Sequence, residues 1–176
     1  MKTLPNRRLW PIFREGTFAH PCVKVALTSS ILKALKPRVT QVKNKLSLEL
    51  SDLKIMATAA EAEALDNKWP VTIAIVDDGG HLLYLQRLDG APAISAHIAP
   101  AKANTAALGQ RESKVYEDVI NGGRTSFLSV PVIQGLLEGG VPVMSGGQCL
   151  GAVGVSGVKS SEDAQIARAA IAALGL

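Results

Sequence analysis

Apolar residues recur at helical spacing from residue 53 onward, and this pattern predicts an amphipathic helix near the start of a folded domain. Ser47 or Ser51 can cap its beginning, while Asn67 and Pro70 end it. Asp52 or Glu49 would then lie in the first turn, where a negative charge is favourable. The expected buried face consists of Leu53, Met56, Ala57, Ala60 and Ala64.

Two pairs of short apolar runs flank turn sequences, and each pair predicts a β-hairpin. In the first, Asp-Asp-Gly-Gly at 77–80 joins residues 71–76 to 81–88. In the second, Ser-Gly-Gly-Gln at 145–148 joins residues 141–144 to 149–155. Hairpin connections produce antiparallel strands, because parallel neighbours need longer crossovers.

Further helices are predicted between and after the two hairpins. They cover the Ala-rich residues 92–108, the shorter segment 112–120, and a C-terminal helix capped by Ser160 or Ser161. Residues 131–137 are expected to form a short helix or an irregular apolar segment. The order of elements predicts an α+β domain with a central antiparallel sheet of about five strands flanked by helices.

Charge divides the 176 residues into two parts, 1–44 and 45–176. The first carries nine Lys and Arg against one acidic residue, whereas the second is mildly acidic, although the whole chain has net charge +4. We interpret 1–44 as a basic N-terminal extension outside the domain 45–176. Three explanations stay open: a targeting segment, a disordered arm, or a start codon assigned too early, with Val42 as the true start.

Composition also limits the partners. Aromatic residues make up only 4% of the chain, and the domain itself is acidic, so we expect no nucleic-acid partner. No apolar run reaches the roughly 18 residues that span a bilayer, so we expect no membrane insertion and a cytoplasmic location. The cysteines, Cys22 and Cys149, have neither disulfide-framework nor zinc-site spacing.

Five ordered motifs in residues 46–176 resemble the GlcG/HbpS-like family, which includes the C-terminal domain of PduO adenosyltransferases. The nearest variant is the GlcG type, encoded beside glycolate-utilisation genes. The motifs are Ile-Val-Asp-Asp-Gly-Gly-His-Leu at 75–82 with Arg-Leu-Asp-Gly-Ala at 87–91, Lys-Ala-Asn-Thr-Ala-Ala at 102–107, Gly-Gly-Arg-Thr-Ser-Phe at 122–127, Gly-Gly-Val-Pro-Val at 139–143, and Gly-Ala-Val-Gly-Val-Ser-Gly at 151–157.

The resemblance implies a profilin-like or PAS-like sheet and assembly into dimers or larger rings. It also implies haem as a candidate cofactor, because some members bind or handle haem and others are linked to corrinoid enzymes. A GlcG-type chain carries no agreed activity.

Several charged residues are candidates for binding a small anionic ligand. Lys102, Arg111 and Arg124 can bind a carboxylate such as a haem propionate, and Thr125 follows Arg124 in a glycine-containing loop. Asp77, Arg87 and Asp89 are expected to form a polar cluster at the ends of the first hairpin. Each charged group could equally serve turn formation, a structural pair or a solvated surface.

His81 and His97 are the candidate iron ligands, since a neutral imidazole binds haem iron. Gly154 and Gly157 belong to a repeated glycine series on a predicted strand. They can line a ligand wall, permit close backbone packing or form a subunit interface. Neither Ser145 nor Ser156 lies in a nucleophile motif, and the sequence has no phosphate-binding loop of the Walker type.

The sequence therefore predicts an oligomeric, small-ligand-binding accessory protein of bacterial metabolism, with haem as the candidate ligand. The alternative is an enzyme acting on a small organic acid, with Asp77, Lys102 and Arg124 around one pocket. A third possibility is an interaction module that assembles through its glycine-rich strand.

Overall fold

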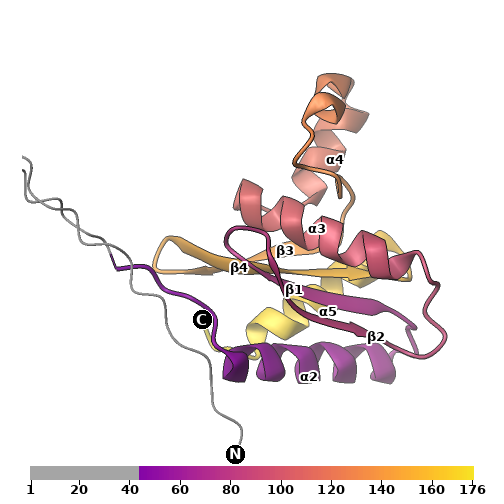
Figure 1. The fold of residues 1–176 in the computed structure, drawn as a ribbon. Helices are drawn as coiled ribbons and strands as arrows, with labels where there is room; N and C mark the ends of the chain where they lie inside the picture. Colours follow the sequence, from indigo (N-terminus) through magenta and orange to yellow (C-terminus); the bar gives the residue numbers. More distant parts are fainter. Residues whose placement is uncertain (1–43) are drawn as a thin grey trace, which may run out of the picture. The chain divides into compact units, whose positions relative to one another are not determined.

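The computed structural model describes residues 44–176, which belong to one compact unit, Lys43–Leu176. The predictions for residues 1–43 lie outside the described residues. Within 44–176 there are four α-helices, a 3₁₀ helix and four strands (Figure 1). In chain order they are α2 (Leu50–Asp66), β1 (Thr72–Asp77), β2 (Leu82–Arg87), α3 (Ser95–Gly109), α4 (Lys114–Asn121), η1 (Thr125–Ser129), β3 (Gly140–Ser145), β4 (Gln148–Ser156) and α5 (Ser160–Ala172).

Helix α2 confirms the helical pattern read from the sequence. Its first turn is fixed by Asp52, whose carboxylate accepts a 2.8 Å hydrogen bond from the Glu49 N–H, and Asn67 caps its end. The buried residues of the helix are the five that the spacing selects: Leu53, Met56, Ala57, Ala60 and Ala64.

The sheet has the strand order β2-β1-β4-β3, and every neighbouring pair is antiparallel. Both predicted hairpins are confirmed. The expectation of about five strands is wrong for the described residues, which form four. The stretch between α4 and β3 adds no strand, because it forms η1 and an irregular segment whose Gly135 packs directly on the backbone of Ala101 and Lys102.

Helices cover both faces of the sheet (Figure 1). On one face, α2 and α5 bury Ile73, Ile75 and other β-branched residues with Met56 and Ile166. On the other face, α3 packs its alanines against Val76 and Ala152. Helix α4 and η1 continue beyond α3, on the side away from the sheet. The turn of the first hairpin therefore lies beside α3, where a site is assembled.

Candidate functional site

A pocket of about 450 Å³ lies where the first hairpin turn, helix α3 and the irregular segment after η1 meet. Polar and apolar groups contribute about equally to its wall, which is open to solvent, and His81 supplies its imidazole. In small-ligand sites a few polar groups usually fix the orientation of the ligand within a concave pocket. The lining residues are Gly79, Gly80, His81, Ala101, Asn104, Leu108, Pro131, Val132 and Gln134.

Asp77, the last residue of β1, holds His81 in place. Its Oδ1 accepts hydrogen bonds from the N–H groups of Gly79 (2.9 Å) and His81 (2.8 Å), which closes the turn. His81 Nδ1 lies 3.1 Å from both carboxylate oxygens of Asp77. The His81 side chain is 80% exposed, and among residues 44–176 its Nε2 has no hydrogen-bond partner. A carboxylate that holds one ring nitrogen in this way leaves the other available to a metal.

The pKa of Asp77 is lowered from its ordinary value. Desolvation acts in the opposite direction and raises it, but the hydrogen bonds and charge of His81 and the N–H of Gly79 together outweigh that effect. The Asp77 carboxylate is therefore ionised at neutral pH and remains a hydrogen-bond acceptor for the imidazole.

Asn104 ties the turn to helix α3. Its Nδ2 donates a 3.2 Å hydrogen bond to the carbonyl oxygen of Gly80. Gly80 has φ +79°, and a Cβ at this position would overlap the Asn104 amide. Asn104 belongs to the motif at 102–107 but was not predicted to have a role, and the wall residues Leu108, Val132 and Gln134 were not predicted either. These residues are far apart along the chain, and no pattern in the sequence indicates that they line one pocket.

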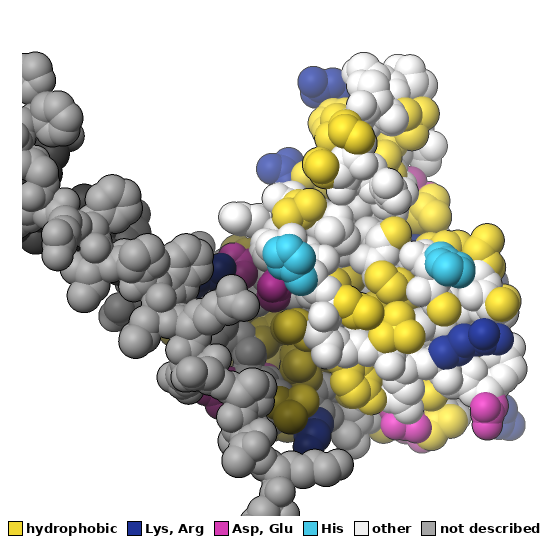
Figure 2. Space-filling model, in the orientation of Figure 1, with side chains coloured by type: hydrophobic (Ala, Val, Ile, Leu, Met, Phe, Trp, Pro, Cys, Tyr) yellow, Lys and Arg dark blue, Asp and Glu magenta, His cyan; other side chains and the backbone are white. Residues whose placement is uncertain are grey.

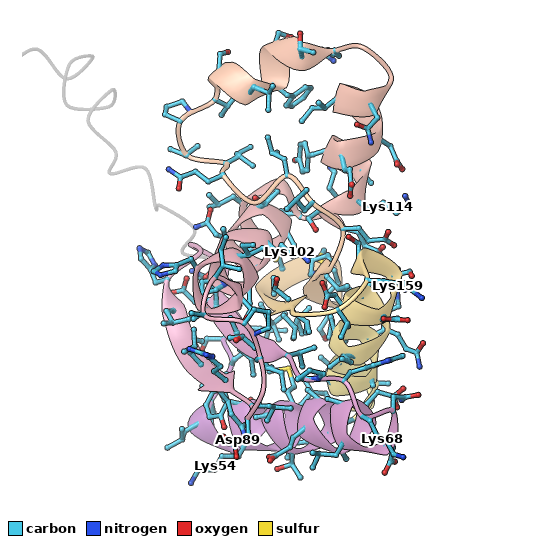
Figure 3. All side chains as sticks on the ribbon, turned by 90° about the vertical axis from the view of Figure 1, so that its right-hand side faces the viewer. Lys54, Lys68, Asp89, Lys102, Lys114 and Lys159 are labelled. Carbon is cyan, nitrogen blue, oxygen red and sulfur yellow. The ribbon has the colours of Figure 1, made fainter. Side chains whose placement is uncertain are left out.

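Lys102 is buried and does not line this pocket. Its Nζ donates to Asp163 Oδ2 (2.7 Å) and to the Val155 carbonyl oxygen (3.0 Å), linking α3 to β4 and α5. Figure 3 shows Lys102 in the interior, with Lys159 at the start of α5. The expected cap of α5 at Ser160 or Ser161 is wrong: the N-cap residue is Lys159, whose N–H donates to the Glu162 carboxylate (3.1 Å).

Arg111 and Arg124 each lie over an aromatic ring that follows within a few residues in the chain. The guanidinium carbon is 5.8 Å from the Tyr116 ring centroid for Arg111 and 4.9 Å from the Phe127 centroid for Arg124. Thr125 begins η1 and is exposed. Neither arginine lines the pocket at the first hairpin.

The expected polar cluster of Asp77, Arg87 and Asp89 does not form. In the β1–β2 ladder Arg87 pairs with Thr72, whereas Asp77 is at the turn, so the two residues occupy opposite ends of the hairpin. Arg87 Nε instead donates to the Ala91 carbonyl oxygen (3.0 Å). An antiparallel hairpin separates the last residue of its second strand from the turn by the full length of the strand.

His97 lies on α3 with its side chain exposed. Figure 2 shows the two histidines of the described residues on one face of the molecule but well apart. His97 is not among the residues that line the pocket at the hairpin, so only one of the two candidate iron ligands does so.

Gly154 and Gly157 provide close packing within the chain. A Cβ at Gly154 would overlap the backbone of Ala99 and Ala103 on α3, and one at Gly157 would overlap Pro70. Gly154 is buried beneath α3 and exposes no surface. Of the three expected roles, it therefore serves close backbone packing and not a ligand wall or a subunit interface.

Two kinds of feature are absent from residues 44–176. No group of three or more His, Cys, Asp or Glu side chains is placed to hold a metal ion there. No helix in this range is long and apolar enough to cross a membrane.

Comparison with known proteins identifies the family. Residues 48–172 match the family model described as haem degrading protein HbpS-like. Protein GlcG of Escherichia coli strain K12 is 50% identical over 115 residues, covering 65% of this chain and 85% of GlcG.

Solved structures agree with this match. The PduOC:heme complex has a TM-score of 0.65 and 32% identity, covering 73% of this chain and 95% of that one. A double mutant of HbpS from Streptomyces reticuli has a TM-score of 0.71 and 29% identity, covering 79% and 94%. The family model spans most of the chain, and the chain belongs to the HbpS-like family.

Proposed function

We propose that this protein binds haem in the pocket at the first hairpin, with His81 Nε2 as a ligand to the iron. The observation that carries the proposal is the Asp77–His81 pair at the edge of that pocket: Nδ1 is held by a carboxylate, and Nε2 has no partner within the described residues. Neutral imidazole is a common axial ligand of haem iron.

The pocket residues fit such a group. Leu108, Val132 and Pro131 offer apolar surface to a macrocycle, and Gly79 and Gly80 let the turn approach closely without side chains. Asn104 holds the turn in place on α3. When bound, haem would supply redox and ligand-binding chemistry at its iron. The chain's own residues would orient the imidazole and present apolar side chains to one face of the group.

We place this binding in an oligomeric accessory protein of bacterial metabolism. The PduOC relative, solved as a haem complex, and the description of the family as HbpS-like haem degrading proteins support haem as the ligand. Assembly into an oligomer, a profilin-like or PAS-like classification of the sheet, a link to glycolate utilisation and a cytoplasmic location stay predictions.

The alternative of an enzyme for small organic acids gains less support. It requires Asp77, Lys102 and Arg124 around one pocket, but the pocket at the first hairpin is lined by neither cation. Lys102 is moreover occupied by Asp163. Binding is therefore the function that the geometry supports best.

Titration of the full chain with haem tests the proposal, with the Soret band as the signal. We expect saturable binding and a Soret shift in the wild type, loss of that shift in His81→Ala, and its retention in His97→Ala. The two histidines are matched, because both side chains are exposed. A Soret shift that survives His81→Ala, or disappears only in His97→Ala, would overturn the assignment of the ligand. Absence of saturable binding by the wild type would overturn the function.

A further inference from the structure

The two edges of the sheet differ in how well they are protected from pairing. Edge strand β3 contains Pro142, which lacks the N–H that a further strand would need. Edge strand β2 contains no proline and no charged residue before Arg87. Within residues 44–176 no strand pairs with the outer side of β2. Open edges of this kind are templates for another strand, and proteins usually block them.

Backbone groups on the outer side of β2 can be assigned from the ladder. The Leu88 N–H donates to the Val71 carbonyl oxygen (3.0 Å), so the backbone groups of Leu88 point toward β1. Alternate residues of a strand direct these groups to opposite sides. The N–H and C=O groups of Arg87 and Leu85 therefore point outward, where no described strand accepts them.

Apolar side chains flank these outward groups. Leu82, Leu83 and Leu85 are all exposed. Leu85 pairs with Ala74 on the face that carries α3, and the helix makes far fewer contacts with β2 than with β1 or β4, so it leaves this edge uncovered. Exposed leucines beside an unpaired strand edge are unfavourable in an isolated molecule and favour a partner.

We propose that β2 pairs antiparallel with β2 of a second copy of this chain, with Leu85 at the twofold axis. Two copies joined through the same edge satisfy both sets of backbone groups, and such a closed twofold interface is the commonest kind. The inference rests on the proposed assembly into oligomers, but it does not depend on haem binding.

Charge favours this register. An antiparallel pairing centred on Leu85 sets Arg87 opposite Leu83 of the second copy, whereas a pairing centred on Arg87 would set two guanidinium groups against each other.

The test compares Leu85→Lys with Met144→Lys in the full chain. These residues are exposed to similar extents, 41% and 38%, on the two edge strands. A lysine at position 85 should reduce the mass measured by light scattering by about twofold, because it breaks a two-copy interface. Lysine at 144 should leave the mass unchanged. Circular dichroism establishes that both variants are folded.

Amide hydrogen exchange tests the strand pairing itself. The amides of Leu85 and Arg87 should exchange slowly in the wild type and fast in Leu85→Lys, because they have no acceptor within a single copy. A monomeric wild type would overturn both the assembly and this interface. A different result would overturn the interface alone: an oligomeric wild type whose Leu85 and Arg87 amides exchange fast, and whose mass is unchanged in Leu85→Lys. Haem titration reads out separately from both results.

Discussion

Two pairs of a carboxylate with a nitrogen base, one buried and one exposed, show how burial changes the role of similar chemistry. The Lys102–Asp163 pair has an N···O distance of 2.7 Å, and both side chains are almost fully buried (3% and 2% exposed). The His81–Asp77 pair has an N···O distance of 3.1 Å, with side chains 80% and 35% exposed. In the first pair the charges satisfy each other inside the protein. In the second, one ring nitrogen remains available to a ligand.

This difference separates structural from ligand-binding groups better than residue type does. Lys102 was a candidate ligand-binding cation because lysine can bind a carboxylate. It does bind one, but that carboxylate is Asp163 of its own chain. His81, by contrast, is held through Nδ1 by Asp77, while its Nε2 remains available to a ligand. Substitutions in the two pairs, and in the polar groups around them, should therefore differ in their cost in free energy of unfolding.

The largest effect is expected from Lys102→Met, which leaves the carboxylate of Asp163 buried and unpaired. Loss of one partner of a buried pair typically lowers the free energy of unfolding by about 3–5 kcal/mol. Urea denaturation measures this change. The double variant Lys102→Met, Asp163→Leu is the control, and it should recover most of the loss because no charge remains unpaired. A loss below about 1 kcal/mol in the single variant would show that the pair does not stabilise the fold.

The pH dependence of that loss follows from Asp163. Burial raises the pKa of Asp163, and the hydrogen bond and charge of Lys102 with the N–H of Val158 lower it without fully offsetting the burial. Without Lys102 the pKa rises further. A carboxyl whose pKa is higher in the folded state takes up a proton more readily there, so the free energy of unfolding increases as the pH falls. The deficit of Lys102→Met should therefore be smaller at about pH 5 than at about pH 7.5.

The contrast between the two pairs also explains what the sequence could predict. Helix α2, both hairpins and the buried face of α2 followed from local periodicity and turn residues, which act over a few positions. The family resemblance could likewise be recognised from motifs that are only a few residues long. Asp77 and His81 are four residues apart, so their turn was visible.

Contacts between distant residues could not be predicted in this way. Asp163 is 61 positions from Lys102, and nothing in the spacing indicates that they meet. Likewise, Arg87 and Asp77 belong to one short hairpin, yet the antiparallel ladder places them at its opposite ends. Residues 131–137 have no period of their own, and only their packing on α3 makes them a wall of the pocket.

Two buried hydroxyl groups near Lys102 should differ in how much they contribute to stability. Ser113 Oγ donates to the Leu137 carbonyl oxygen and accepts a hydrogen bond from the Gly140 N–H (2.8 Å), whereas among the described residues Thr105 Oγ1 has no partner. Ser113→Ala leaves buried backbone groups unsatisfied and should lower the free energy of unfolding by about 1–3 kcal/mol. Thr105→Val removes only an unpaired hydroxyl, so urea denaturation should detect no loss. Equal losses in the two variants would contradict this distinction.

The smallest cost in stability is expected at the exposed pair. Asp77→Asn retains an oxygen for the N–H groups of Gly79 and His81 but removes the charge facing the imidazole. For an exposed pair the free energy of unfolding should fall by only about 0.2–1 kcal/mol at neutral pH. Since the pKa of Asp77 is lower in the folded state, its charge stabilises the protein above the ordinary carboxyl pKa. That contribution, and with it the difference between variant and wild type, should disappear as the pH falls through the pKa of folded Asp77.

Haem affinity should respond to the same substitution far more strongly than stability does. Removal of a carboxylate that orients a ligating histidine typically weakens metal binding about 10–100-fold. Asp78→Asn is the matched control, because this adjacent carboxylate pairs with Lys45 (2.7 Å) and not with His81. Titration of both variants with haem, followed by the Soret band, should therefore show weaker binding only in Asp77→Asn. Equal affinities would mean that Asp77 merely closes the turn, and the exposed pair would then be as structural as the buried one.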